Sequence, residues 1–199
     1  MTTEFQKSQT RGGRSRTIEN RKSSHALRTA LPGLAAQLIF WPLTAAGFAL
    51  DLWSKRAVFD WLQQQQGGSV SIINGFLRLV TAENAGAAFG IATGQRHLLV
   101  AVSIIALIVI LAVFLFSGAE HKLMYIALAL FTAGVCGNLY DRIFNNGRVR
   151  DFIDVVYWPG RHWPAFNLAD TMLCVGVGLI IISSFFTDKS ARKHAQQHI

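Results

Sequence analysis

Two aspartates lie at the edges of long apolar runs, where a carboxylate is energetically unfavourable unless it has a specific role. Asp151 lies in Val149-Arg150-Asp151-Phe152, and Asp170 opens the last apolar run of the chain. An ionised carboxylate close to hydrocarbon is costly, so an ionisable group at such a depth is a functional candidate. Two carboxyl groups that meet can share one proton and together activate a water molecule. The pair therefore predicts hydrolysis at a membrane boundary.

Further polar residues accompany the ends of the other apolar runs. Asp51 and Lys55 are four residues apart, which is the spacing of an ion pair on one helical face, and we interpret them as structural support. Asn84 and Gly86 belong to Asn84-Ala85-Gly86-Ala87-Ala88-Phe89-Gly90, where small residues permit a close backbone approach. This segment could present hydrogen bonds to a peptide, or it could be an ordinary glycine-rich turn.

A second group closes the third apolar run. Asn138 and Arg142 share one helical face at the i, i+4 spacing. Arg142 could bind a substrate carbonyl or orient an aspartate, and Asp141 beside it could form a salt bridge. Asn167 and Asp170, three residues apart, could instead cap the last helix.

The expected position of these polar residues at one membrane face favours a single polar site over a set of unrelated helix caps and structural ion pairs. Seven polar residues come from separate segments, and a four-span topology places all of them at one membrane face. They are Asp51, Asn84, Asn138, Arg142, Asp151, Asn167 and Asp170. We therefore interpret the chain as an intramembrane aspartyl peptidase.

The composition predicts the scaffold that must position these residues. Of the 199 residues 51% are hydrophobic and 15% are charged. Four runs without a charged residue or histidine cover residues 34–50, 98–116, 123–140 and 171–187. A spanning helix needs about 20 apolar residues. The sequence thus predicts an all-α membrane protein with four transmembrane helices, over about 34–52, 97–116, 122–142 and 169–187; helices buried in a soluble protein or a cleaved first run are the alternatives.

The charge distribution predicts the orientation. The formal net charge is +8, and seven of the 19 Lys and Arg residues lie within the first 28 positions. We expect a disordered basic cytoplasmic tail over residues 1–30, a peptidase domain over 31–187 and a cytoplasmic tail over 188–199. Both termini are then cytoplasmic by the positive-inside rule, and the basic tail needs no nucleic-acid partner.

The connection between the first two runs predicts a small extracytoplasmic β-hairpin or sheet. Residues 69–73 and 76–80 are β-prone and flank Asn74-Gly75, which favours a two-residue type I′ turn. Residues 55–62 read as an amphipathic continuation of the first helix. Cys136 and Cys174 fall inside apolar runs, where a cysteine behaves as a small buried hydrophobe.

The ordered set of motifs resembles bacterial lipoprotein signal peptidase, also called signal peptidase II, an aspartyl peptidase family. The motifs are Asp51-Leu52-Trp53-Ser54-Lys55, Asn84-Ala85-Gly86, Gly137-Asn138-Leu139-Tyr140-Asp141-Arg142, Val149-Arg150-Asp151-Phe152-Ile153-Asp154 and Phe166-Asn167-Leu168-Ala169-Asp170. The resemblance implies an endopeptidase that removes the signal peptide from diacylglyceryl-modified prolipoproteins, cutting before the lipidated cysteine. It implies catalysis by Asp151 and Asp170.

The resemblance also implies roles for the remaining motif residues. The residues expected to bind substrate are Asn84, Gly86, Asn138, Arg142 and Asn167. Those expected to support the structure are Asp51, Lys55 and Asp141. Asp141 and Asp154 are the rival candidates for the catalytic pair.

The expected setting is a bacterial cytoplasmic (inner) membrane, with a multi-pass monomer whose active site lies near the periplasmic face. We expect lipidated prolipoproteins and membrane lipid as partners, and no nucleic acid. We expect no metal or cofactor, since neither His-Glu-x-x-His nor Cys-x-x-Cys occurs. The alternative function is a small four-span transporter or proton-relay protein.

Overall fold

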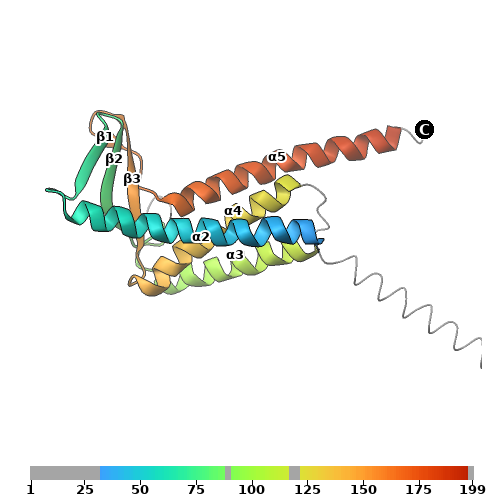
Figure 1. The fold of residues 1–199 in the computed structure, drawn as a ribbon, viewed down its shortest axis with the longest axis horizontal. Coiled ribbons are helices and arrows are strands. Elements are labelled where there is room, and N and C mark those ends of the chain that lie inside the picture. Colours follow the sequence, from blue (N-terminus) through green and yellow to red (C-terminus); the bar gives the residue numbers. More distant parts are fainter. Residues whose placement is uncertain (1–31, 88–90, 117–121, 197–199) are drawn as a thin grey trace, which may run out of the picture.

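A computed structural model describes residues 32–87, 91–116 and 122–196, with the side chains of the last helix described to residue 184 (Figure 1). The expected basic tail 1–30 and part of the glycine-rich motif, residues 88–90, lie outside the described residues. The helices are α2 (Leu34–Gln63), α3 (Arg96–Phe116), α4 (Lys122–Phe144) and α5 (Leu168–Gln196). The strands are β1 (Ser69–Ile73), β2 (Leu77–Asn84), β3 (Val149–Trp158) and β4 (Arg161–His162).

The helices run alongside one another, and the sheet stands at one end of them (Figure 1). Helix α4 is central, because it packs against α2, α3 and α5. Its glycines permit this closeness. A Cβ at Gly134 would lie 2.6 Å from the carbonyl oxygen of Ala169, and a Cβ at Gly137 would collide with the carboxylate of Asp51. Small residues therefore set how near α2 and α5 come to α4.

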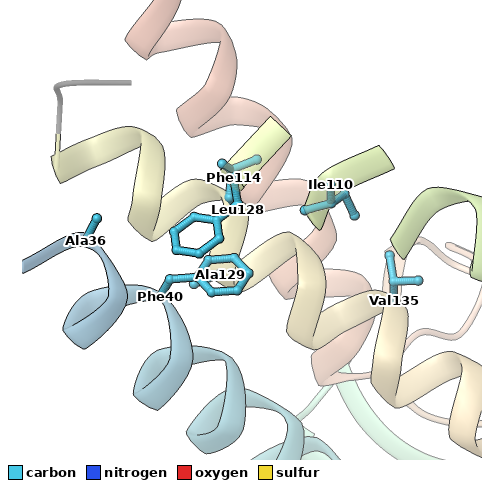
Figure 2. Close-up of a cluster of buried hydrophobic side chains, with 7 residues drawn as sticks. All are labelled: Ala36, Phe40, Ile110, Phe114, Leu128, Ala129 and Val135. Carbon is cyan, nitrogen blue, oxygen red and sulfur yellow. The ribbon is translucent and has the colours of Figure 1, made fainter. Parts of the chain in front are cut away.

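The apolar core joins α2, α3 and α4 (Figure 2). Phe40 stacks on Phe114 with ring centroids 3.9 Å apart and an interplanar angle of 14°. Leu128 and Ala129 of α4 belong to the same cluster. This stacked aromatic contact and the apolar area that it buries stabilise the packing of α2 against α3.

Apolar side chains also cover the outside of the bundle. On α3, Ile105 and Ile108 are 59% and 62% exposed. Within the described residues, α2, α3 and α4 are long and apolar enough to cross a membrane, and the described apolar part of α5, Leu168–Ser184, is shorter. Exposed apolar surface of this extent suits contact with lipid. The expectation of a mostly helical fold with a small antiparallel sheet is confirmed.

The hairpin between β1 and β2 forms, but its turn differs from the prediction. Ile73 pairs with Leu77, so the loop has three residues, and Phe76 N–H donates to the Ile73 carbonyl at 3.0 Å. Gly75 has φ of 74°, whereas Asn74 does not have a positive φ. A type I′ turn needs positive φ at both central residues, so the predicted two-residue turn is wrong.

Strand pairing brings three distant segments to one place. The four strands are antiparallel in the order β1-β2-β3-β4. The register opposes Asn84 to Val149 and Ala82 to Asp151. Phe166 forms an isolated bridge with Ile153 of β3. The end of β2, the start of β3 and the residues before α5 therefore meet at the base of the sheet.

We predict that Gly134→Ala destabilises the fold by about 1–3 kcal/mol, because the added methyl overpacks the contact between α4 and α5. Gly178→Ala is the matched control, since nothing lies within 4 Å of a Cβ at that helical glycine. Thermal unfolding in detergent measures both variants. Equal unfolding midpoints for the two variants would contradict the proposed packing constraint.

Candidate active site

Asp151 and Asp170 line the same cavity, which has a volume of about 530 Å³. Asp151 comes from β3, and Asp170 comes from the first turn of α5. Asn84, Asn138 and Arg142 line this cavity as well. The structure therefore brings five of the residues singled out from the sequence to one cavity.

Two asparagine amides link the carboxyl groups. The Nδ2 group of Asn167 donates to Asp151 Oδ1 at 2.6 Å and to Asn138 Oδ1 at 3.2 Å. The Nδ2 group of Asn138 donates to Asp170 Oδ1 at 2.7 Å. Because each amide is held at both ends, the two aspartates are positioned relative to one another.

Asn167 and Asp170 also cap α5. The Asp170 backbone N–H donates to Asn167 Oδ1 at 3.0 Å, and the Asn167 N–H donates to Asp170 Oδ2 at 3.2 Å. This reciprocal pair has the form of a capping box. The capping and cavity interpretations of these two residues are therefore compatible, since one geometry provides both.

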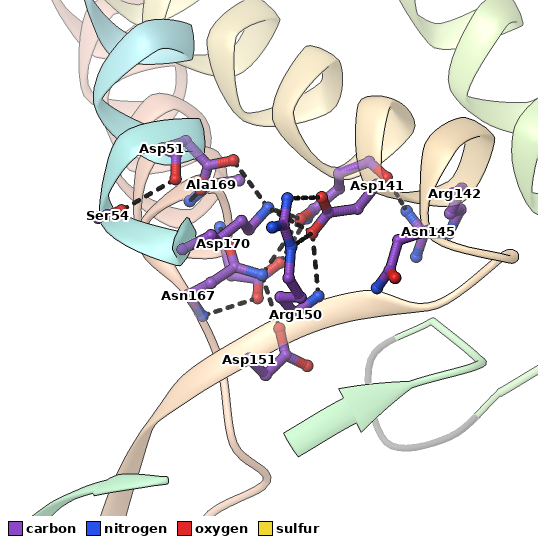
Figure 3. A network of polar contacts seen from close by, with 12 residues as sticks. Asp51, Ser54, Asp141, Arg142, Asn145, Arg150, Asp151, Asn167, Ala169 and Asp170 are labelled. Atoms are coloured by element: carbon purple, nitrogen blue, oxygen red, sulfur yellow. Dashed lines mark hydrogen bonds and ion pairs between the residues drawn. The ribbon is translucent and has the colours of Figure 1, made fainter. Parts of the chain in front are cut away.

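Figure 3 shows Asp51 and Asp141 in one network of polar contacts, and a buried lysine pairs with both carboxylates. Lys55 is fully buried, and its Nζ lies 2.7 Å from Asp51 Oδ2, 3.5 Å from Asp141 Oδ2 and 3.1 Å from Asn138 Oδ1. Asp51 and Asp141 are also fully buried. Lys55 thus pairs with two carboxylates that water does not reach, and buried charges require such pairing.

Each supporting carboxylate holds the backbone next to a candidate catalytic residue. Asp51 Oδ1 accepts a hydrogen bond from the N–H of Ala169 at 2.8 Å. Asp141 Oδ2 accepts one from the N–H of Arg150 at 3.0 Å. Ala169 directly precedes Asp170, and Arg150 directly precedes Asp151. The Lys55 network therefore fixes the starting points of α5 and β3.

Arg142 ties the glycine-rich loop to α4. Its Nη2 donates to the Gly86 carbonyl at 3.1 Å, and its Nη1 donates to the Asn138 carbonyl at 3.3 Å. Asn84 Oδ1 accepts from the Gly86 N–H at 2.9 Å. The Arg142 Nε is buried and has no hydrogen-bond partner in the described part of the chain. It is a donor that the described residues leave unsatisfied.

The rival carboxylates have other partners. Asp154 accepts from Nδ1 of His162 at 2.9 Å and lies 3.8 Å from Nη1 of Arg78, on the sheet. Asp141 binds Nη2 of Arg150 at 2.6 Å. Neither rival lines the large cavity. No group of three or more metal-ligating side chains occurs among the residues that the structure describes.

Arg150 is the supporting residue that the sequence reasoning missed. A salt bridge between Asp141 and its neighbour Arg142 was one of the alternatives from the sequence, but the Asp141 carboxylate pairs with Arg150, from the next element. Strand alternation could have indicated this contact, because Arg150 must point away from the face that Asp151 uses. The wall formed by residues 163–166 was also missed, since it is an irregular segment with no periodic pattern.

Burial, and after it the nearby Asp170 carboxylate, raise the pKa of Asp151, whereas the amides of Asn167 and Asn84 and the Lys55 charge lower it. The net pKa is about 7. Asp151 is 2% exposed, so the low-dielectric surroundings dominate. A carboxyl group with this pKa can hold a proton near neutral pH, as shared-proton chemistry requires.

The raised pKa of Asp151 predicts a pH-dependent stability. The unfolded carboxyl ionises near pH 3.8, whereas the folded one keeps its proton to about pH 7. Stability from this group is therefore full below pH 3.8 and is lost as the pH rises to about 7. Asp151→Asn cannot ionise, so its unfolding free energy should gain about 2–4 kcal/mol over wild type between pH 4 and 8.

Thermal unfolding at several pH values measures this difference, with the exposed Asp60→Asn as the control. Parallel curves for wild type and Asp151→Asn would contradict the assignment.

We predict that Lys55→Met destabilises the fold by about 3–5 kcal/mol, because two buried carboxylates lose their shared cation. Arg56→Met is the matched control, since Arg56 and Asp60 form an exposed pair at 3.8 Å, which is worth about 1 kcal/mol or less. Chemical unfolding in detergent measures the two variants. Equal losses would show that the Lys55 network is not the main support.

Apolar, membrane-capable helices together with two carboxyl groups in one cavity are the features of a membrane-bound aspartic hydrolase. Comparison with known proteins agrees. Residues 43–186 match the family described as "Signal peptidase (SPase) II". The chain is 38% identical over 163 residues to the lipoprotein signal peptidase of Rhodopirellula baltica, covering 74% of this chain and 71% of that protein. It is 34% identical to that of Geobacter metallireducens, covering 78% and 95%.

A solved structure described as a bacterial membrane enzyme, determined by the in meso method, is 33% identical and superposes with a TM-score of 0.65, covering 75% of this chain and 88% of that one. A second structure of that description is 33% identical with a TM-score of 0.61. The chain belongs to the signal peptidase II family, and it is therefore an aspartic peptidase with apolar membrane-capable helices. The transporter alternative gains no support from these similarities.

Proposed function

We propose that this aspartyl endopeptidase removes the signal peptide from diacylglyceryl-modified prolipoproteins, cutting before the lipidated cysteine, with Asp151 and Asp170 as the catalytic pair. The observation that carries the proposal is the shared cavity in which Asn138 and Asn167 link the two carboxyl groups. The similar lipoprotein signal peptidases support the substrate class.

The proposed setting is the bacterial inner membrane, with four spans, both termini in the cytoplasm and the cavity near the periplasmic face. Helix α5 runs for 29 residues, so its backbone is long enough for a fourth span. The cluster of basic residues near the N-terminus supports a cytoplasmic start by the positive-inside rule. The sheet and the cavity then share the extracytoplasmic end of the bundle.

The proposed mechanism uses one water molecule between the two carboxyl groups. The pair titrates as a unit and holds one proton, because two close buried carboxylates cannot both ionise easily. The charged member takes a proton from water, whose oxygen bonds to the scissile carbonyl carbon, while the protonated member donates to the carbonyl oxygen. When the tetrahedral species collapses, the C–N bond breaks and the nitrogen receives a proton, which leaves a carboxylate and a free amine.

The remaining cavity residues have proposed roles in substrate binding. The buried Arg142 Nε is a donor for a backbone carbonyl of the signal peptide. Asn84 and Gly86 hold the loop that Arg142 anchors, while Asn138 and Asn167 orient the catalytic pair. Leu173 and Cys174 line the cavity one turn along α5 from Asp170. This apolar wall would let the acyl chains stay in the bilayer while the peptide bond reaches the carboxyl groups.

We predict that Asp151→Asn and Asp170→Asn each lower cleavage of a lipidated precursor about 10²-fold or more, since each removes a proton-transfer group. The measurement is a gel-shift assay with full-length protein in lipid, with thermal unfolding to show that the variants fold. Asp60→Asn, which changes an exposed carboxylate, should cleave like wild type.

Asp154→Asn tests the alternative that Asp154 belongs to the catalytic pair. The folded variant should cleave the precursor like wild type. Cleavage at the wild-type rate by both Asp151→Asn and Asp170→Asn would remove the catalytic pair from the account.

A further inference from the structure

A second cavity of about 290 Å³ lies on another part of the molecule. It is lined by Leu52, Trp53 and Arg56 of α2, Tyr140 of α4 and Arg150 of β3. None of these residues lines the larger cavity that holds Asp151 and Asp170. The proposed catalytic mechanism therefore assigns no role to this second cavity.

The polar side chains that line the second cavity are rich in hydrogen-bond donors and include no carboxylate. In the described part of the chain, the Trp53 indole N–H and the Tyr140 hydroxyl have no hydrogen-bond partner. The Arg56 side chain is 82% exposed, and its nearest carboxylate, on Asp60, is 3.8 Å away. Donors outnumber acceptors in this set, so it is complementary to a ligand that supplies several acceptors.

Arg150 adds a fixed guanidinium to this set. Its Nε and Nη2 bind the Asp141 carboxylate at 3.4 and 2.6 Å, so the side chain is held in place. The other nitrogen, Nη1, makes no such contact. Asp141 is itself already shared with Lys55. A planar guanidinium anchored on one edge can offer its free edge to a phosphate oxygen.

The second cavity also lies at the level where an apolar helix becomes polar. The uncharged run of α2 ends at Leu50, which is exposed, and Trp53 follows with 68% of its surface exposed. Phe144, at the end of α4, is also exposed. Tryptophan and tyrosine favour the headgroup region of a bilayer, and basic residues there attract anionic lipid.

We propose that this second cavity binds the phosphate of an anionic phospholipid, with Arg56, Tyr140, Trp53 and Arg150 as donors and the exposed apolar side chains beside the acyl chains. Inorganic phosphate has related chemistry, but it would make no use of the exposed Leu50 and Phe144. The inference rests on the membrane placement proposed above and not on the peptidase chemistry.

The test uses full-length protein in neutral detergent, titrated with soluble short-chain phosphatidylglycerol, phosphatidylcholine or inorganic phosphate, with binding followed by microscale thermophoresis. We expect phosphatidylglycerol to bind best. Arg56→Gln and Tyr140→Phe should each weaken that binding about fivefold or more, since each removes a donor to a charged group. Arg161→Gln is the matched control, because it removes an equal charge from the exposed strand β4 and should bind like wild type.

Three results would overturn the proposal. They are equal affinity for the two lipids, equal weakening by Arg56→Gln and Arg161→Gln, and inorganic phosphate binding as tightly as phosphatidylglycerol. Asp151→Asn separates the two proposals. It should lose cleavage and keep lipid binding, so a catalytic pair assigned wrongly and a lipid site assigned wrongly give different outcomes.

Discussion

The enclosed charge of Lys55 is the interaction on which the site depends. Its ammonium lies between two buried carboxylates, on Asp51 and Asp141. Those carboxylates accept hydrogen bonds from the backbone N–H groups of Ala169 and Arg150, the residues that directly precede the two candidate catalytic aspartates. A single cation on α2 therefore positions the first turn of α5 and the first residues of β3. Because removing one partner of such a network leaves an uncompensated buried charge, all of its members constrain one another.

That constraint explains how two acids can be kept close to an apolar bundle. The amides of Asn138 and Asn167 hold the carboxyl groups, and burial together with the neighbouring acid raises the pKa of Asp151 to about 7. The glycines of α4 make the arrangement possible, since a side chain at Gly137 would collide with Asp51. The same packing that builds the bundle therefore also creates the environment that keeps a proton on the pair.

Much of this arrangement follows from the sequence, and the exceptions have physical reasons. The apolar runs and the i, i+4 spacing of Asp51 and Lys55 are local signals, so the helices and that ion pair could be predicted. The pairing of Asp141 with Arg150 could not be read from adjacency, because it depends on where β3 returns to α4. The hairpin turn differed because Asn74 kept ordinary backbone angles, and the wall at residues 163–166 has no periodicity.

The central claim is that Asp151 and Asp170 behave as one acid–base unit. The most direct measurement is a carboxyl carbon NMR titration of aspartate-labelled full-length protein, with Asp151→Asn and Asp170→Asn used to assign the two signals. The account predicts that the Asp151 carboxyl carbon reports an apparent pKa near 7 and that Asp170→Asn lowers it. An Asp151 titration near pH 4 that Asp170→Asn leaves unchanged would contradict it.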